Sequence, residues 1–396
     1  MKTRLILSII LLGILLTQCK KTPSVEEESE NDLVIVETFG SNIDLYKLQN
    51  YANQPLPAYI KKNNAGNKLI SDSKATLGRV LFYDKQLSID NSISCGSCHI
   101  QEFAFGDTAI SSKGVSGGKT ARHSIRLINV KFGDEKRLFW DKRASSLEEL
   151  IPMPIKEHTE LGYSGQPGRP SIEDMIVKLQ QLPYYKVLFR FVYKDSIVSE
   201  LRIKECLTDF IRSIQSFDSK YDQGRNTVND NLSDFSNFTE QENKGKRLFM
   251  QGVVLSGDKK RVGGGLGCNG CHLAPEFDMN PAGGNNGITG KLNAAGKDYG
   301  TTRSPSLRDI TRSSGKVNTP MMHTGEHKTL DDIAKHYNSI DPDNNNPNID
   351  PRLFNNGLGI KLNMTAEETA ALIAFLKTLA GSNVYIDRKW SNPFLK

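Results

Sequence analysis

Apolar residues recur with helical spacing in two well-separated parts of the chain. The first stripe is followed by Gly224 and consists of Leu207, Phe210, Ile211, Ile214, Phe217 and Tyr221. This spacing predicts one amphipathic helix that ends near the glycine. The second stripe lies within residues 372–379, and Gly381 follows it as a stop signal. Both stripes are typical of helices packed against a core.

Helix-start signals agree with this pattern. Thr239 and Thr365 are each followed, three residues later, by a glutamate, Glu242 and Glu368. Such pairs are typical of capping boxes, in which each side chain bonds the other residue's backbone N–H. Strand patterns are sparse, so we predict a mainly α-helical fold. Two glycine-rich stretches are predicted to form surface loops: residues 252–267 and 280–300.

The chain contains a degenerate internal repeat. The string LGRVLF at residues 77–82 corresponds to KGKRLF at residues 244–249. The order then continues with RHSIRL at 122–127 and SLEEL at 146–150, and with RSPSL at 303–307 and TLDDI at 329–333. The same elements in the same order predict two related domains.

The length of 396 residues suits two domains of ordinary size. We predict an N-terminal domain over residues 65–230 and a C-terminal domain over residues 231–396. Residues 19–64 would form a tether and entry segment. The formal net charge is +6, and the basic residues are scattered rather than grouped. This distribution favours a solvated surface and gives no indication of a nucleic-acid partner.

The N-terminus has the form of an export signal over residues 1–18. Lys2 and Arg4 precede an apolar run over residues 5–16, which is too short to span a bilayer as a stable anchor. Cys19 follows directly, as in a bacterial lipoprotein, although Gln18 is bulkier than the usual small residue. An ordinary cleaved signal is the alternative. Either form predicts a periplasmic protein, and a lipid at Cys19 would attach it to a membrane.

The sequence Cys-x-x-Cys-His occurs twice. One copy is Cys95-Gly-Ser-Cys98-His99 and the other is Cys268-Asn-Gly-Cys271-His272. This spacing attaches haem c, with two thiols forming thioethers and the histidine ligating iron. A redox-active dithiol needs no following histidine. A zinc site built from the four cysteines would leave both histidines surplus. We therefore predict two covalently bound haem c groups, one in each domain.

Four further strings accompany the repeat and the haem motifs. They are FWDxRA at 139–144, PIxxxxELG at 154–162, PxMHxG at 320–325 and AFLxTL at 374–379. Together they resemble the bacterial di-haem cytochrome c peroxidase family, which includes the MauG-type enzymes. The resemblance covers roughly residues 65–385. It implies two helical c-type cytochrome domains, with the N-terminal haem reacting with peroxide and the C-terminal haem receiving electrons.

The resemblance also implies roles for single residues. His99 and His272 would be the proximal iron ligands. Glu160 stands where the family has a distal carboxyl, which takes a proton from one peroxide oxygen and gives it to the departing one. Trp140 stands where the family has an electron relay between the haems. The alternatives are a surface charge for Glu160 and a packed aromatic ring for Trp140.

The sixth ligands differ between the two irons. Many family members have a histidine in the loop after the first motif, but residues 100–121 contain no histidine or methionine. We therefore predict an open or water-bound first iron, with Lys113 or Lys119 as alternative ligands. The resemblance places Tyr337 at the second iron, and the adjacent His336 is an alternative. A tyrosine ligand differs from methionine, which raises the potential.

Two positions depart from the family. Leu150 stands where the family often has a glutamine near the distal carboxyl, so a second hydrogen bond to peroxide would be missing. His123 stands where the family has an asparagine that helps to bind calcium between the haems. Imidazole is a poor ligand for a hard, oxygen-seeking cation, which argues against calcium.

The sequence thus predicts a peroxidase that reduces hydrogen peroxide to water. Electrons would come from a small cytochrome c or a cupredoxin, and the family's tendency to dimerise implies a homodimer. One alternative is a MauG-like oxidase of a partner protein, which Tyr337 favours. The other is a non-catalytic di-haem electron carrier in which protein side chains cap both irons.

Overall fold

The computed structural model describes residues 25–341 and 343–395. The predicted export signal and Cys19 lie outside these residues. The longer helices are α1 (Val25–Phe39), α2 (Asp72–Tyr83), α6 (Ile172–Gln181), α7 (Pro183–Tyr193), α8 (Glu200–Ser213), α10 (Glu240–Met250), α11 (Leu330–Asn338) and α12 (Ala366–Lys377). The shorter ones are α3 (Cys95–Cys98), α4 (Leu147–Leu150), α5 (Pro152–Lys156), α9 (Lys220–Arg225) and α13 (Asn383–Ile386).

Strands are few and short, as predicted. Three antiparallel ribbons pair β1 (Val253–Leu255) with β2 (Arg261–Gly264), β3 (His272–Leu273) with β4 (Asp278–Met279), and β5 (Phe354–Asn355) with β6 (Leu358–Gly359). The mainly helical fold is therefore confirmed. No helix in the described ranges is both long and apolar enough to cross a membrane.

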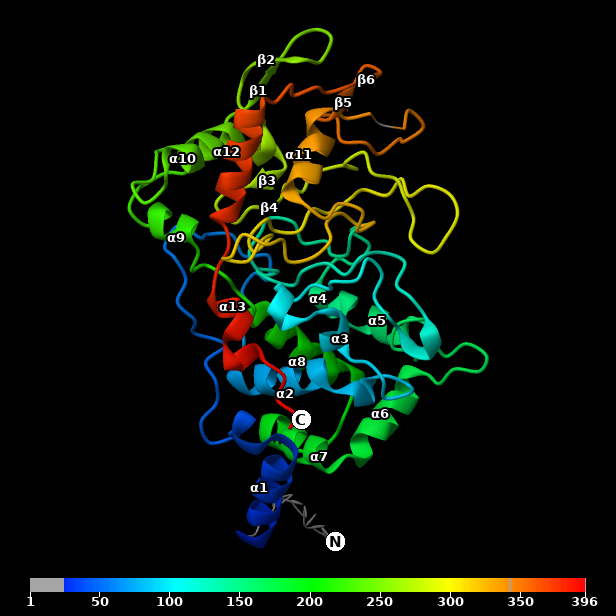
Figure 1. Cartoon of the computed structure of the whole chain (residues 1–396). Helices are drawn as coiled ribbons and strands as arrows, with labels where there is room; N and C mark the ends of the chain where they lie inside the picture. The colour runs from blue at the N-terminus through cyan, green and yellow to red at the C-terminus, as the bar shows by residue number, and fades with distance from the viewer. Residues whose placement is uncertain (1–24, 342, 396) are drawn as a thin grey trace, which may run out of the picture.

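Each half of the molecule is built on one pair of packed helices. Helices α2 and α8 pack together in one half, and α10 and α12 pack together in the other (Figure 1). A Cβ added to Gly78 of α2 would overlap the carbonyl oxygen of Cys206, and one added to Gly245 of α10 would overlap that of Ala371. The glycine shared by the repeated strings therefore lets both helix pairs approach closely.

The aromatic packing beside these contacts also repeats. The rings of Phe82 and Phe210 lie 5.1 Å apart in the first half, and those of Phe249 and Phe375 lie 5.2 Å apart in the second. Cys206, on helix α8, is fully buried. The repeat in the sequence therefore corresponds to two similar helix crossings.

Buried apolar side chains form two separate clusters. The first runs from Ile35 to Ile214 and the second from Tyr221 to Leu379. The chain then returns, so that Val384 and Trp390 are buried in the first cluster. The domain ranges stay a prediction. The predicted ranges assign this returning segment to the C-terminal domain, although its buried side chains belong to the first cluster.

Several contacts hold the returning segment in place. The Nε of Arg79 donates to the Ser391 carbonyl (2.6 Å), and the Tyr83 hydroxyl donates to the Trp390 carbonyl (2.7 Å). The indole of Trp390 donates to the Ser213 hydroxyl (3.1 Å). The last part of the chain thus completes the core of the first half.

The predicted single helix over residues 207–221 is wrong. Helix α8 ends at Ser213, and a capping box at Ser219 starts α9, which contains Gly224. The amide of Asn129 exchanges hydrogen bonds with the backbone of Ser216 (2.8 and 3.1 Å), which holds the intervening segment in a non-helical form. Hydrogen bonds from Asn129, which is distant in the sequence, thus override the helical spacing of the apolar residues here.

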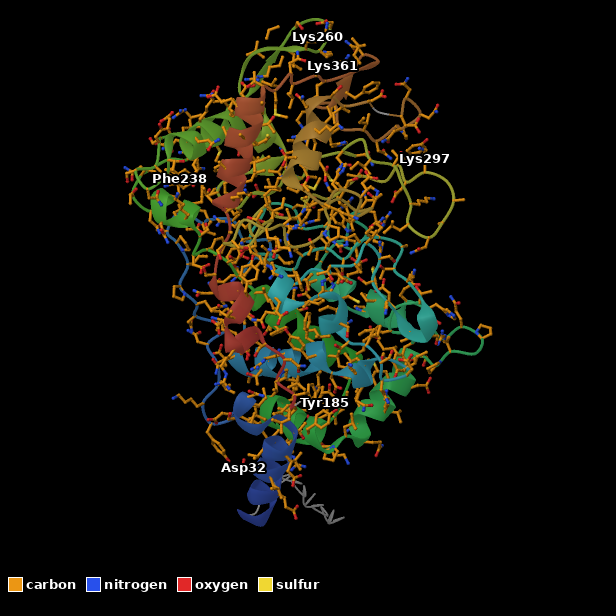
Figure 2. All side chains as sticks on the ribbon, in the orientation of Figure 1. Asp32, Tyr185, Phe238, Lys260, Lys297 and Lys361 are labelled. Atoms are coloured by element: carbon orange, nitrogen blue, oxygen red, sulfur yellow. The ribbon has the colours of Figure 1, made fainter. Side chains whose placement is uncertain are left out.

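The predicted capping boxes are confirmed, whereas one predicted loop is wrong in part. Both capping boxes are present, at Thr239 and Thr365. The stretch 252–267, predicted as a loop, instead contains the β1–β2 hairpin. Arg261 fastens this hairpin to α12 through both oxygens of Glu368 (2.7 and 2.9 Å). Lys260 lies close to Lys361 at the end of the hairpin (Figure 2).

Candidate haem-binding active site

Each Cys-x-x-Cys-His motif borders its own cavity. The first cavity, of about 220 Å³, is lined by Cys95, Cys98 and His99. The second, of about 340 Å³, is lined by the second motif: Cys268, Cys271 and His272. Most of the remaining wall of each cavity consists of aliphatic and aromatic side chains. An apolar cavity bordered by two thiols and an imidazole suits a covalently attached porphyrin.

Both histidines are arranged as metal ligands. The Nδ1 of His99 lies 3.0 Å from the Phe105 carbonyl oxygen, so a proton on Nδ1 leaves Nε2 free to coordinate. The Ser304 hydroxyl oxygen lies 3.1 Å from the Nδ1 of His272 and 3.4 Å from its Nε2, so the nearer contact favours a proton on Nδ1. Burial lowers the pKa of His99, and burial followed by the charge of Arg352 lowers the pKa of His272 to about 4. Both imidazoles are therefore neutral at ordinary pH, as iron coordination requires.

The thiols are unsuited to the alternative roles. Burial raises the pKa of Cys95 and of Cys268 to about 12, which suppresses the thiolate that a redox dithiol needs. Within residues 25–341 and 343–395, no group of three or more His, Cys, Asp or Glu side chains could hold a metal ion. A zinc site made from both cysteine pairs is therefore excluded.

The two cavities share one wall. Six residues line both: His123, Ser124, Ile125, Arg126, Trp140 and Arg303. The Nε atoms of Arg126 and Arg303 and the Nε2 of His123 are buried and have no hydrogen-bond partner among the described residues. Guanidinium groups at this position could pair with the carboxylates of haem propionates. The residues present thus fit haem c at both sites.

Trp140 is held rigidly within the shared wall. Its indole N–H donates to the His123 carbonyl (2.6 Å), and its own carbonyl accepts from the Arg303 N–H (2.6 Å). Only 9% of its surface is exposed, and its ring packs against that of His323. An aromatic side chain therefore lies between the two cavities, where the sequence analysis expected one.

Glu160 lies in the wall of the first cavity. It lies in the loop that follows α5. The backbone carbonyl of Glu160 accepts a hydrogen bond from the Val115 N–H (3.0 Å). Burial, followed by repulsion from Glu157, raises the pKa of Glu160 to about 7, against a smaller opposing effect of Arg143. The side chain is partly buried rather than a free surface charge.

The rest of this wall offers few ligands. Leu150, which stands where the family often has a glutamine, lines the cavity. Its neighbours Ile151 and Leu147 also line the cavity and are apolar. Lys113 is an exposed side chain that borders the cavity, whereas Lys119 is not among the lining residues. Among the residues that line it, there is no methionine or tyrosine. An open first iron stays a prediction.

The second cavity has a different set of side chains. Tyr337 of α11 lines it together with Met279, Met321 and Met322. Burial is the main cause that raises the pKa of the Tyr337 phenol above its usual range. His336, the alternative ligand, does not line this cavity, and its Nε2 lies 3.0 Å from the Asn286 carbonyl oxygen.

Sequence reasoning missed Arg126, Arg303 and Asn286 as cavity residues. The two arginines stand in the repeated strings at 122–127 and 303–307, so the repeat itself carried a signal for them. Asn286 had no such signal, because it lies in the glycine- and asparagine-rich stretch whose conformation the spacing does not define.

Two cavities that each contain a Cys-x-x-Cys-His motif, joined by an aromatic and cationic wall, fit a di-haem c-type protein. Residues 72–229 match the family model of di-haem cytochrome c peroxidase. This match confirms the resemblance predicted from the motifs and covers the N-terminal part of the chain.

Individual relatives agree with this assignment. The methylamine utilization protein MauG of Methylophilus methylotrophus is 25% identical over 79% of this chain and 84% of its own length. The cytochrome c551 peroxidase of Nitrosomonas europaea is 26% identical over 78% of this chain and 80% of its own. The relatives thus include both peroxidases and MauG.

Solved structures show the same fold. A MauG-like protein associated with microbial copper homeostasis is 27% identical and superposes with a TM-score of 0.66, covering 86% of this chain and 99% of its own. The di-haem peroxidase BthA of Burkholderia thailandensis, at 19% identity, superposes with a TM-score of 0.55 over 86% of this chain and 94% of its own. The latter likeness concerns the fold alone.

Proposed function

We propose that this chain is a di-haem c-type peroxidase that reduces hydrogen peroxide to two molecules of water. The reaction consumes two electrons from a small cytochrome c or cupredoxin and two protons. Bound haem c would supply redox-active iron at His99 and His272. The observation that carries the proposal is the carboxyl of Glu160 in the largely apolar wall of the cavity bordered by His99.

Glu160 would manage the protons. With a pKa of about 7 it is partly protonated at neutral pH, so its carboxyl can both accept and donate. It would take a proton from one peroxide oxygen and return it to the oxygen that leaves as water. The apolar neighbours of Glu160 exclude water from the carboxyl and help to keep the neutral form available.

Trp140 would carry electrons between the two sites. Its ring lines both cavities, and its two backbone-linked hydrogen bonds hold it in one orientation. Tyr337 would be the sixth ligand of the iron at His272. In this arrangement the second site transfers electrons and the first reacts with peroxide.

Glu160→Gln tests the proposal in the haem-loaded protein. We expect the rate of peroxide reduction with a ferrous cytochrome donor, measured by stopped flow, to fall about 10²–10⁴-fold, as for loss of a general acid–base. Glu157→Gln is the matched control, since Glu157 is exposed three residues away and does not line the cavity. Equal rates for Glu160→Gln and wild type would remove Glu160 from the mechanism.

A MauG-like oxidase is the second candidate function. Tyr337 in the second cavity and the likeness to MauG favour it. Such an enzyme would withdraw electrons from residues of a partner protein. A co-purifying protein that becomes oxidised, with no turnover of cytochrome donors, would favour this candidate. A resting spectrum with both irons capped by side chains would instead favour a plain electron carrier.

The proposed location is the periplasm, with a lipid at Cys19. Cys19→Ser would remove the lipid site but leave an exported chain. We expect the variant to move from the membrane fraction to the soluble periplasmic fraction. A wild-type protein that is already soluble would indicate ordinary signal cleavage.

A further inference from the structure

Two side chains of different ligand type line the second cavity. The phenol of Tyr337 and the thioether of Met322 both border the cavity that contains His272. The two would give opposite redox behaviour, because a methionine ligand raises the haem potential. Something in the protein must therefore decide which of them reaches the iron.

Asn286 contacts Met322 directly and the helix of Tyr337 through a neighbouring residue. Its Nδ2 donates to the sulfur of Met322 at 3.1 Å, and its backbone carbonyl accepts from the imidazole of His336, the residue before Tyr337. Asn286 itself lines the same cavity. One residue thus holds the methionine and joins the helix that carries the tyrosine.

The orientation of this amide is fixed by its surroundings. The backbone N–H of Ile288 donates to the Asn286 Oδ1 at 3.2 Å, so the oxygen must face Ile288 and the NH₂ group must face the cavity. The carbonyl of Asn286 accepts a hydrogen bond from His336 at 3.0 Å, which ties the loop to α11 next to Tyr337. Asn286 therefore acts from a rigid position.

Met322 is also restrained. Its backbone φ is +68°, in the left-handed region that a side chain with a Cβ rarely adopts. Its carbonyl accepts from the Gly325 N–H at 3.0 Å, which holds this turn. The turn and the amide contact together hold the sulfur at Asn286.

We propose that Asn286 is the positioning residue that keeps Tyr337, and not Met322, as the sixth ligand of the iron at His272. Its N–H group occupies a lone pair of the thioether and holds the sulfur at Asn286, which leaves the phenol of Tyr337 to reach the iron. This inference rests on the ligand that the proposed function gives to Tyr337.

Asn286→Ala in the haem-loaded protein tests the proposal. We expect the spectroscopic signature of tyrosine ligation to be replaced by the sulfur-to-iron charge-transfer band of a methionine-ligated ferric haem. The ferrous state should gain at least tenfold in relative stability, which is about 59 mV upward for a one-electron couple. Adding Met322→Leu should abolish both changes.

Two further variants serve as a second test and as a control. Asn286→Asp keeps the Oδ1 that accepts from Ile288 but lacks the donor, so it should also lose tyrosine ligation even if the alanine variant folds poorly. Asn293→Ala is the matched control in the same loop. Asn293 donates to the Thr120 carbonyl (2.9 Å) and does not line the cavity, so its spectrum should be unchanged.

The outcomes distinguish a failure of the positioning role of Asn286 from a failure of Tyr337 as the iron ligand. Unchanged tyrosine ligation and potential in both Asn286 variants would overturn the positioning role. A vacant site in Asn286→Ala that Met322→Leu does not alter would overturn the part given to Met322. A wild-type protein that already shows methionine ligation would instead refute Tyr337 as the ligand, and so the assumption beneath the inference.

Discussion

The two cavities are bordered by the same kind of motif but differ in the other side chains that line them. Each is bordered by the two thiols and the imidazole of its motif, and each half contains a helix pair that crosses at a glycine. The first cavity then presents the Glu160 carboxyl among aliphatic side chains, whereas the second presents Tyr337 and Met322. In the proposed function, the duplicated motifs would attach the haem groups, and the side chains that differ between the cavities would divide the chemistry.

Substitution of the glycines at the two helix crossings should have the largest effect, which is on the free energy of unfolding. Gly78→Ala and Gly245→Ala should each lower the free energy of unfolding by about 3 kcal/mol, because the new Cβ overlaps a backbone carbonyl that cannot move aside. The better helix propensity of alanine, about 1 kcal/mol, does not offset this overlap. Chemical denaturation of the haem-loaded variants measures the change.

Gly257→Ala serves as the control, since nothing lies within 4 Å of a Cβ added there. Similar losses at Gly78 and Gly245 would support equivalent helix crossings. A large loss at only one of them would break the structural equivalence of the halves.

Trp140 tests whether the shared wall connects the two sites. Trp140→Phe removes the N–H that donates to the His123 carbonyl and the larger ring that borders both cavities. We expect electron transfer between the haems to slow at least tenfold in single-turnover measurements, roughly 1.4 kcal/mol in barrier. The first step of the reaction with peroxide should keep its rate.

The other tryptophan provides the control for this experiment. Trp390 is buried in the first cluster but lines neither cavity, so Trp390→Phe should leave the inter-haem rate unchanged. Equal rates in both variants and wild type would show that electrons take another route.

The smallest expected effect concerns pH and distinguishes the first site, which presents the carboxyl of Glu160, from the second, which presents the phenol of Tyr337. The pKa of Glu160 rises from 4.5 to about 7 on folding, so the folded state holds its proton more tightly than the unfolded chain. Stability from this group is complete below pH 4.5 and is lost as the pH rises towards 7. The loss should be about 1–2 kcal/mol after allowance for solvent at its exposed edge.

Glu160→Gln should not show this loss, because the amide does not titrate. Denaturation of both proteins at pH 4.5 and pH 8 measures the difference. If wild type and variant changed in parallel with pH, the raised pKa of Glu160 would be contradicted.

Local patterns predicted much of this molecule. Haem motifs, capping boxes and the repeated strings depend on residues a few positions apart, and they identified the helical fold, the attachment sites and the family. The break between α8 and α9 was not predictable in this way, because Asn129 imposes it from another part of the chain. The wall formed by Arg126 and Arg303 likewise arises only when the two halves come together.

The returning C-terminal segment has a consequence for the order of assembly. Val384 and Trp390 fill part of a core whose other members begin at Ile35. Because a chain is synthesised from its N-terminus, the core formed by those members cannot close until the last residues have been made. A truncation just after α12 would therefore damage the half that was synthesised first, and leave the half next to the cut with its own core intact.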